Sequence, residues 1–269
     1  MRKKNLPAGV PAVRKEHGTP APLPASVEKW ERERLPAGVP AVRKKNLPAE
    51  VPAVRKGKEY MTLENRRKIV KLISLVVGLA GVMVMIGWIF DIEILKSLSP
   101  SWISMKFDTA LSFFLSGLTL YFIARAQEGE FDRAQVVISI TSLVIILLMG
   151  ILFFSTVFGV MTGAEHLFVR EEAGGVKTVI PGLPSIPTMF SFILMAMAGV
   201  LTILRIRRLH VSLMIIGLIL AAVGISAITG YVIDFPALYY YIATVNSAMA
   251  FHTAVLLALL GIGLICLYE

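Results

Sequence analysis

The sequence predicts an all-α integral membrane protein, with six transmembrane helices arranged as three pseudo-repeated hairpins after a disordered N-terminal tail. Three observations lead to this prediction. The chain of 269 residues is 56% hydrophobic and has a mean hydropathy of +0.73, whereas soluble domains are about 45–50% apolar. Six apolar segments follow Arg66, each near the roughly 20 residues that a helix needs to cross a bilayer. Short motifs also recur from one segment to another.

Residues 1–60 form the predicted tail. They carry 14 Lys or Arg against 6 acidic residues, while the rest of the chain is almost balanced, with 13 against 12. The decamer LPAGVPAVRK occurs at 6–15 and 35–44, and LPAEVPAVRK follows at 47–56. Closely spaced prolines disfavour regular structure, so we expect disorder. Either this basic tail contacts anionic lipid headgroups or a partner, with no role in nucleic-acid binding, or Met61 is the true start and the tail is not made.

Residues 61–269 form the predicted membrane domain. Its helices are expected, within a few residues at each end, at 68–90, 106–125, 134–160, 187–204, 211–232 and 245–267. Lys and Arg precede the first helix and fill the second and fourth connections, and such cations mark the cytoplasmic side. The outward connections are then 91–105, 161–186 and 233–244. We therefore expect a multi-pass protein of the plasma membrane, with both termini in the cytoplasm.

The first and last hairpins share two motifs. MKFDTALSFFLSG, at Met105–Gly117, returns as MAFHTAVLLALLG at Met249–Gly261. Before the turn, GWIFDIEIL at Gly87–Leu95 resembles GYVIDFPAL at Gly230–Leu238. This agreement extends beyond hydrophobicity, because polar residues and glycines recur at the same offsets. We therefore interpret the two hairpins as diverged copies of one unit.

The middle hairpin matches less closely. When Gly199 is placed in register with Gly117 and Gly261, Ser191 aligns with Thr109 and Thr253. The same alignment puts Pro187 at the position of the two motif-initial methionines. We expect a third copy of the unit in this register.

The first hairpin carries the pattern GW-x-FDI-x-x-LKSL-x-P-x-W-x-x-MKF-x-TAL-x-F-x-x-x-G, and the chain ends with AMAFHTAVLLALLGIGL. These motifs resemble the multi-helix membrane module that precedes PAS, GAF, histidine-kinase or diguanylate-cyclase domains in prokaryotic sensor proteins. The resemblance implies a signal-input module that responds to an external or membrane-borne stimulus and signals through its sixth helix. It differs in carrying Asp108, where such modules usually have Asn, and in stopping at Glu269, so we expect a separate cytoplasmic kinase or cyclase, or a homo-oligomer, as partner.

Polar residues at the outer starts of the even-numbered helices are the candidate sensing residues. They are accompanied by aromatic residues near the same membrane surface, and the full set is Asp108, Thr109, His252, Thr253, Trp88, Trp102 and Tyr231. One interpretation is helix capping and close packing, which needs no ligand. The other is a shallow external pocket, in which Asp108 and His252 form a charge-assisted pair, since ionisable residues within membrane helices are costly.

Other functions lack the residues that they require. The single Cys266 can form no internal disulfide, and no Cys/His cluster suggests a metal. His252 is the one histidine well within a predicted helix, so paired axial ligands for haem are missing. No Ser/His or paired-Asp arrangement indicates a catalytic site, and we expect neither an enzyme nor a cofactor. The alternative to a sensor is a small transporter or channel-like protein for a neutral or lipophilic solute.

Overall fold

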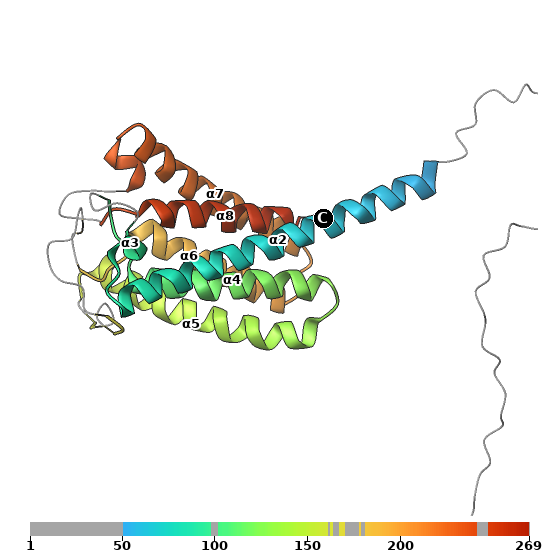
Figure 1. Ribbon diagram of the computed structural model, residues 1–269. Helices are drawn as coiled ribbons and strands as arrows, with labels where there is room; N and C mark the ends of the chain where they lie inside the picture. The colour runs from blue at the N-terminus through green and yellow to red at the C-terminus, as the bar shows by residue number, and fades with distance from the viewer. Residues whose placement is uncertain are drawn as a thin grey trace, which may run out of the picture. The chain divides into compact units, whose positions relative to one another are not determined.

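Helices account for all the regular secondary structure in the described part of the chain. The computed structural model describes residues 51–97, 102–160, 162–163, 167–169, 178, 181–240 and 247–268. Its longer helices are α2 (Val51–Ile89), α4 (Phe107–Gln127), α5 (Phe131–Phe158), α6 (Ile186–Ile203), α7 (Leu209–Val232) and α8 (Phe251–Cys266). Two short helices, α3 (Glu93–Lys96) and η2 (Pro236–Tyr239), follow α2 and α7. Figure 1 shows α4, α5, α6 and α8 lying side by side.

Five of these helices are long and apolar enough to cross a membrane. They are α4, α5, α6, α7 and the part of α2 at Glu64–Ile89. The sixth, α8, is also apolar but has 16 residues. Several apolar helices of this length fit the prediction of a multi-pass membrane protein.

Two helix boundaries differ from the predicted ones. Residues 1–50 lie outside the described residues, but α2 already begins at Val51, within the predicted tail. Pro52 is compatible with this start, because the first turn of a helix does not need the N–H that proline lacks. At the other end of the chain, α8 begins at Phe251, later than the predicted 245. The residues just before it, 247–250, are buried but not helical.

Glycines allow the closest helix contacts. A Cβ on Gly117 of α4 would lie 2.7 Å from the Ser74 carbonyl oxygen of α2. A Cβ on Gly261 of α8 would lie 2.5 Å from the Ala221 nitrogen of α7. Real Cβ atoms do not approach backbone so closely, so these two crossings require glycine. Small residues that let backbones touch are the usual means of packing helices in membranes.

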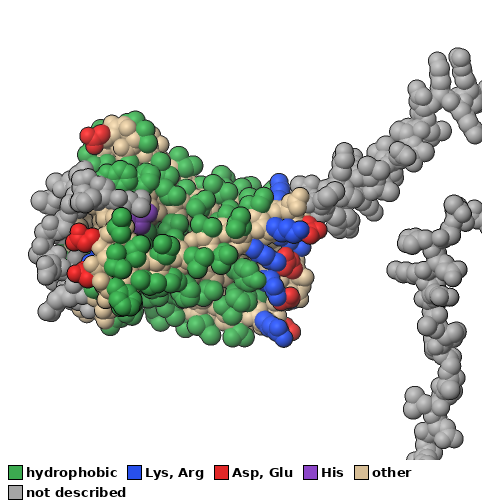
Figure 2. All heavy atoms as spheres, viewed as in Figure 1, with side chains coloured by type: hydrophobic (Ala, Val, Ile, Leu, Met, Phe, Trp, Pro, Cys, Tyr) green, Lys and Arg blue, Asp and Glu red, His purple; other side chains and the backbone are tan. Residues whose placement is uncertain are grey.

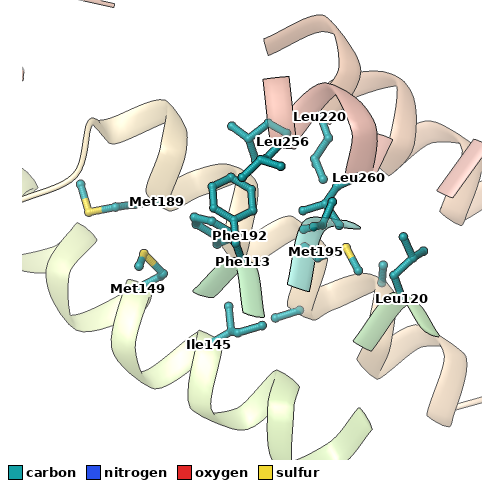
Figure 3. Packing of buried hydrophobic residues seen from close by; sticks show 14 of the residues in the cluster. Phe113, Leu120, Ile145, Met149, Met189, Phe192, Met195, Leu220, Leu256 and Leu260 are labelled. Atoms are coloured by element: carbon teal, nitrogen blue, oxygen red, sulfur yellow. The ribbon is translucent and has the colours of Figure 1, made fainter. Parts of the chain in front are cut away.

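Large apolar side chains fill the space between α4, α5, α6 and α8. Phe113 and Phe192 meet edge to face, with ring centroids 4.8 Å apart, and lie beside Met195 and Leu256 (Figure 3). All four helices contribute residues that are fully or almost fully buried. This interior positions the ends of the helices relative to one another.

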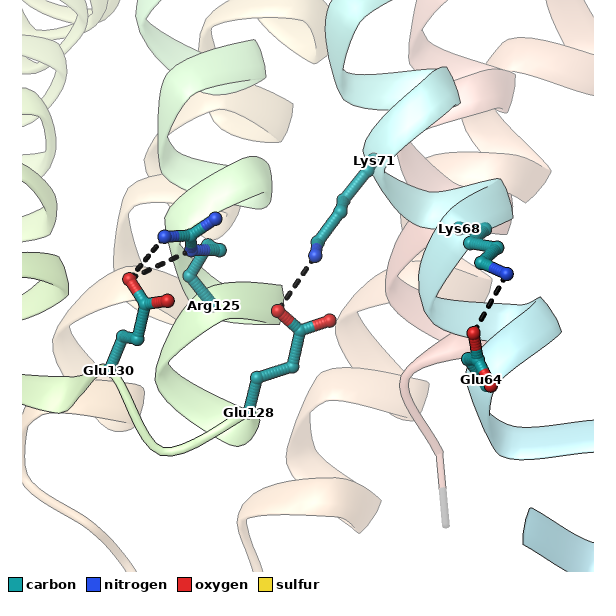
Figure 4. A network of polar contacts seen from close by, with 6 residues as sticks. All are labelled: Glu64, Lys68, Lys71, Arg125, Glu128 and Glu130. Carbon is teal, nitrogen blue, oxygen red and sulfur yellow. Dashed lines mark hydrogen bonds and ion pairs between the residues drawn. The ribbon is translucent and has the colours of Figure 1, made fainter. Parts of the chain in front are cut away.

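Lys and Arg side chains gather at one end of the helices (Figure 2). We call this the cationic end, and its basic residues are Arg66, Arg67, Lys68, Lys71, Arg125, Arg133, Arg205, Arg207 and Arg208. Lys71 of α2 pairs with Glu128 after α4 at 2.7 Å, and Arg125 pairs with Glu130 (Figure 4). Exposed pairs of this kind contribute at most about 1 kcal/mol each.

The cationic end also joins the first helix to the last. The Arg66 guanidinium donates to the Tyr268 carbonyl oxygen at 2.9 Å. His210 Nδ1, at the start of α7, lies 3.2 Å from the Leu267 carbonyl oxygen. The end of α8 therefore contacts both α2 and α7.

Candidate functional site

At the end opposite the cationic end, three non-helical stretches of backbone lead into α4, α6 and α8. We call these residues, 104–106, 183–185 and 248–250, the lead-in segments. Their last residues are the N-caps of the helices and have nearly the same conformation: φ/ψ is −68°/150° at Lys106, −67°/148° at Ser185 and −67°/146° at Ala250. All three residues are buried. Non-helical backbone at membrane depth is tolerated where protein covers it.

The lead-in segments enclose a small polar cavity together with one threonine from each following helix. These threonines are Thr109, Thr188 and Thr253, and we call the space the threonine cavity. Its volume is about 10 Å³, which is close to the minimum that holds one water molecule. The starts of α4, α6 and α8 therefore meet around a cavity about the size of one water molecule.

Two of the three threonine hydroxyls have no hydrogen-bond partner among the described residues. Thr188 Oγ1 lies 2.7 Å from Ser185 Oγ and shares a hydrogen bond with it. Thr109 and Thr253 are each 2% exposed, and neither hydroxyl bonds to any of the described residues. Buried hydroxyls are usually hydrogen-bonded. The cavity therefore presents two hydroxyl groups that are free to bind.

The helix starts add backbone N–H groups. The first hydrogen bonds within the helices run from Ala110 to Lys106, from Met189 to Ser185 and from Ala254 to Ala250. N–H groups earlier in each helix have no intrahelical acceptor, and no side chain caps any of these three starts. Three positive helix ends therefore point toward the cavity.

Asp108 and His252 are not the N-cap residues of α4 and α8. The N-caps are Lys106 and Ala250, so Asp108 and His252 already lie inside the first turn of their helices. An N-cap side chain reaches the exposed N–H groups from outside that turn, and neither residue is in that position.

Trp88 and Tyr231 hold two of the lead-in segments in place. The Trp88 indole N–H donates to the Met105 carbonyl oxygen at 2.8 Å, and the Tyr231 hydroxyl donates to that of Met249 at 2.7 Å. The backbone N–H groups of the same methionines are also bonded, to the carbonyl oxygens of Lys96 and Tyr239. Both segments are therefore fixed from two sides.

Trp102 belongs to an aromatic cluster beside the cavity. Its ring centroid lies 5.6 Å from that of Tyr231 and 5.0 Å from that of Phe251. Tyr231 in turn stacks on Tyr239 at 4.5 Å. The cluster joins the α2–α4 connection to α7 and α8, so the aromatic candidates from the first and last hairpins do come together.

Asp108 and His252 do not form the expected pair. Asp108 is buried and His252 is half-buried, but neither lines the cavity. No ion pair among the described residues joins them, and His252 Nε2 has no hydrogen-bond partner there. Both lie beside the site and outside its lining.

The residue that sequence analysis missed is Thr188. The predicted register placed Ser191 at this position, but the Ser191 hydroxyl donates to the Pro187 carbonyl oxygen within its own helix at 2.7 Å. Thr188 follows Pro184 at the distance in sequence at which Thr109 follows Met105. In this register Thr188, and not Ser191, corresponds to Thr109.

A second hollow lies between α2 and α4. This groove has a volume of about 420 Å³. Its lining is mainly aliphatic and aromatic, with Lys71 at one end and Leu79, Val82 and Phe114 further along. It has the size and character to accept an apolar molecule.

The described residues contain no group of three or more His, Cys, Asp or Glu that could hold a metal ion. No protein-family model, no curated protein and no solved structure matches the chain. The similarity to prokaryotic sensor modules therefore rests on the sequence motifs alone.

Proposed function

We propose that this chain is a membrane-embedded sensory or signal-input module without catalytic activity. One observation carries the proposal: three helix starts meet around the threonine cavity, and one of those helices, α8, runs from the cavity to the cationic end. A change at the cavity can therefore be passed along a single rigid helix. The sequence motifs of prokaryotic sensor modules point in the same direction.

We further infer six membrane crossings built from three copies of one hairpin, α2–α4, α5–α6 and α7–α8. The ends of α2, α5 and α7 support this, because each closes with a hydrogen bond to the fifth residue back: Ile92 to Gly87, Val160 to Ser155 and Phe235 to Gly230. The residue before each donor has a positive φ, at Asp91, Gly159 and Asp234. The matching N-cap conformations of α4, α6 and α8 support it as well.

The proposed orientation places the cationic end in the cytoplasm and the threonine cavity toward the outside of the plasma membrane. Basic residues flanking membrane helices are retained on the cytoplasmic side, and the cationic end holds most of the described Lys and Arg. Both ends of the membrane domain then face the cytoplasm. A cytoplasmic histidine kinase or cyclase could contact α8 there.

Signalling requires two arrangements of the helices that bind the stimulus with different affinity. The lead-in segments are the elements that a bound ligand would touch. Their displacement would move the first turn of α8, and the contacts of Tyr268 with Arg66 and of Leu267 with His210 would change at the other end. These contacts make the cationic end the expected site of the output.

Cys266 provides a native reporter for the test. It is the single cysteine of the chain, it is half-buried, and it is the last residue of α8. We expect a change at the cavity, 13 residues earlier at Thr253, to alter the rate at which a maleimide modifies Cys266 in detergent or nanodiscs. The variant is Thr109→Val with Thr253→Val, and Thr229→Val on α7 is the matched control.

An unchanged rate of Cys266 modification in the double variant, with its fold intact by circular dichroism, would contradict signalling through α8. A change of twofold or more, absent from the control, would support it. The reaction is followed by mass spectrometry, so that the result does not depend on a partner protein.

The groove between α2 and α4 favours a second candidate, a transporter or channel-like protein for a neutral or lipophilic solute. Its volume of about 420 Å³ suits such a solute. Uptake of a lipophilic dye by proteoliposomes, reduced by Leu79→Trp in the groove, would select this function. Equal uptake by empty and protein-containing vesicles would reject it for that dye.

A further inference from the structure

The groove between α2 and α4 follows the crossing of these two helices. At the crossing, a Cβ on Gly117 would lie 2.7 Å from the Ser74 carbonyl oxygen and 2.8 Å from the Gly78 nitrogen. Both glycines line the groove, and neither has a side chain to fill the hollow of about 420 Å³ beside the contact. The close crossing and the groove therefore have the same origin.

The groove has the length of one membrane leaflet. Its lining on α2 runs from Lys71 to Val82, a rise of roughly 16 Å along a helix. Its lining on α4 covers the matching stretch from Tyr121 back to Phe114. The hydrocarbon core of a bilayer is about 30 Å thick, so one leaflet contributes about 15 Å. A hollow of this length holds a chain from one leaflet and is too short to be a path across both.

The walls of the groove are apolar and open toward the surroundings of the protein. Leu72, Leu75 and Leu79 line it and are 61%, 58% and 54% exposed. The Ser74 hydroxyl donates to the Lys71 carbonyl oxygen of its own helix at 2.7 Å. The walls therefore offer apolar surface to a hydrocarbon chain, which can enter sideways from a bilayer.

Cations flank the mouth of the groove, at the cationic end. Lys71 lines the groove and reaches across from α2 to Glu128, with its Nζ 2.7 Å from the carboxylate (Figure 4). An ammonium group has three donors, so this pair leaves donors for a further oxygen acceptor. On the other side of the mouth Tyr121 lines the groove, and the Arg125 guanidinium lies 5.9 Å from its ring centroid.

The charge around the mouth favours an anionic headgroup. Among the described residues, the nine basic side chains of the cationic end are accompanied by four acidic ones, Glu64, Glu128, Glu130 and Asp132. Lys and Arg bind phosphate through charge-assisted hydrogen bonds, and basic pockets between membrane helices bind anionic lipid headgroups. The excess of cations selects a headgroup with a net negative charge over a neutral one.

We propose that the groove binds one acyl chain of an anionic phospholipid from the leaflet at the cationic end, with the phosphate at Lys71 and Arg125. The hollow accounts for the chain, and the adjoining cations account for the headgroup. This site is separate from the threonine cavity and does not depend on signalling through α8.

Native mass spectrometry of the full chain in detergent tests the headgroup. The chain is incubated with equal amounts of phosphatidylglycerol and phosphatidylcholine that carry the same acyl chains. We expect the wild-type chain to retain phosphatidylglycerol in about fivefold excess, the effect of one cation near an anionic lipid, and Lys71→Gln to bring the two lipids near equality. Lys68→Gln is the matched control, since Lys68 also pairs with a glutamate, at 2.8 Å on the same helix, but does not line the groove. It should keep the excess.

Gly78→Leu tests the acyl chain. A Cβ on Gly78 meets nothing closer than the Phe114 carbonyl oxygen at 4.0 Å, so leucine extends into the groove without overlapping the backbone. We expect this variant to lose the retained phospholipid. Gly150→Leu on α5 is the matched control, because a Cβ there meets nothing within 4 Å, and it should retain phospholipid like the wild-type chain. Circular dichroism checks that both variants fold.

Two results would overturn the proposal: equal retention of the two lipids by the wild-type chain, or unchanged retention in Gly78→Leu. A phosphatidylglycerol with a diazirine in the middle of one acyl chain gives a measurement that needs no variant. Crosslinks concentrated at Leu75, Leu79 and Leu118 support the site. Crosslinks spread equally over α5 and α7 reject it.

The lipid site and the functions proposed above can be rejected separately. Retention of phosphatidylglycerol with a constant modification rate of Cys266 in the cavity variant supports the lipid site and rejects signalling through α8. Dye uptake that Leu79→Trp reduces, without preferential retention of phosphatidylglycerol, selects the transporter and rejects the lipid site.

Discussion

Trp88 and Tyr231 make the same contact from different helices. Each projects from near the end of its helix and donates a hydrogen bond to the carbonyl oxygen of a methionine, at 2.8 Å for Trp88 and 2.7 Å for Tyr231. Both methionines lie one residue before the N-cap of the next long helix. One indole and one phenol therefore serve the same structural purpose.

Tyr231→Phe should lower the free energy of unfolding by about 1–2 kcal/mol, because it leaves the buried Met249 carbonyl without this donor. The change removes one oxygen atom and keeps the ring in its aromatic cluster. Tyr268→Phe is the control, since Tyr268 is 40% exposed and its hydroxyl has no partner among the described residues. Equal stability of the two variants, measured by reversible unfolding in detergent, would show that the hydrogen bond is unimportant.

Gly117→Ala and Gly261→Ala should each destabilise the chain by about 1–3 kcal/mol or more, since a Cβ would overlap backbone of the neighbouring helix. Gly150→Ala on α5 is the matched control. A Cβ there meets nothing within 4 Å, and alanine favours a helix by roughly 0.5–1 kcal/mol over glycine. The melting temperature should therefore fall for the first two variants and stay constant or rise for the third. A similar change in melting temperature for all three variants would refute the close crossings.

Asp108→Asn and His252→Asn should have additive effects on stability. No hydrogen bond or ion pair among the described residues links the two side chains, and unlinked substitutions usually add within about 0.5 kcal/mol. A double-mutant cycle in melting temperature measures the coupling. Coupling well above that value would mean that the two residues pair in a state other than the described one.

The proposed topology is tested with single cysteines in a Cys266→Ser background. Glu93→Cys and Ala237→Cys, both at exposed positions, should react with an impermeant thiol reagent in intact cells. Asp132→Cys, exposed at the cationic end, should react only after the membrane is opened. Labelling of the Asp132 position from outside would reverse the orientation. Ser185 is unsuitable as a labelling site, because it is 2% exposed.

Hydropathy and helix length were enough to predict most helices. The predicted helix 211–232 lies within α7, Leu209–Val232. The predicted helix 106–125 lies within α4, Phe107–Gln127, except for residue 106, which is the N-cap. The start of α8 was missed because 247–250 are as apolar as a helix would be, and hydropathy does not distinguish a buried non-helical segment from a buried helical one.

The site was predictable only in part. Thr109 and Thr253 were found because their motifs recur in the sequence. Thr188 was not, since it lies almost one helical turn before Ser191 and therefore on nearly the same face, so the pattern alone could not choose between them. The pairing of Trp88 and Tyr231 with backbone carbonyls depends on how the connections fold back, which no local pattern records.

The short length of α8 has an electrical consequence. Its 16 residues span about 24 Å, whereas the hydrocarbon core of a bilayer is about 30 Å thick. With its last residues at the cytoplasmic surface, its first turn would lie roughly 6 Å below the outer one. An ion that enters there crosses part of the transmembrane voltage, which amounts to about 2.3 kcal/mol per charge over 100 mV for the full thickness. Occupancy of the threonine cavity by any charged ligand would then depend on membrane potential as well as on concentration.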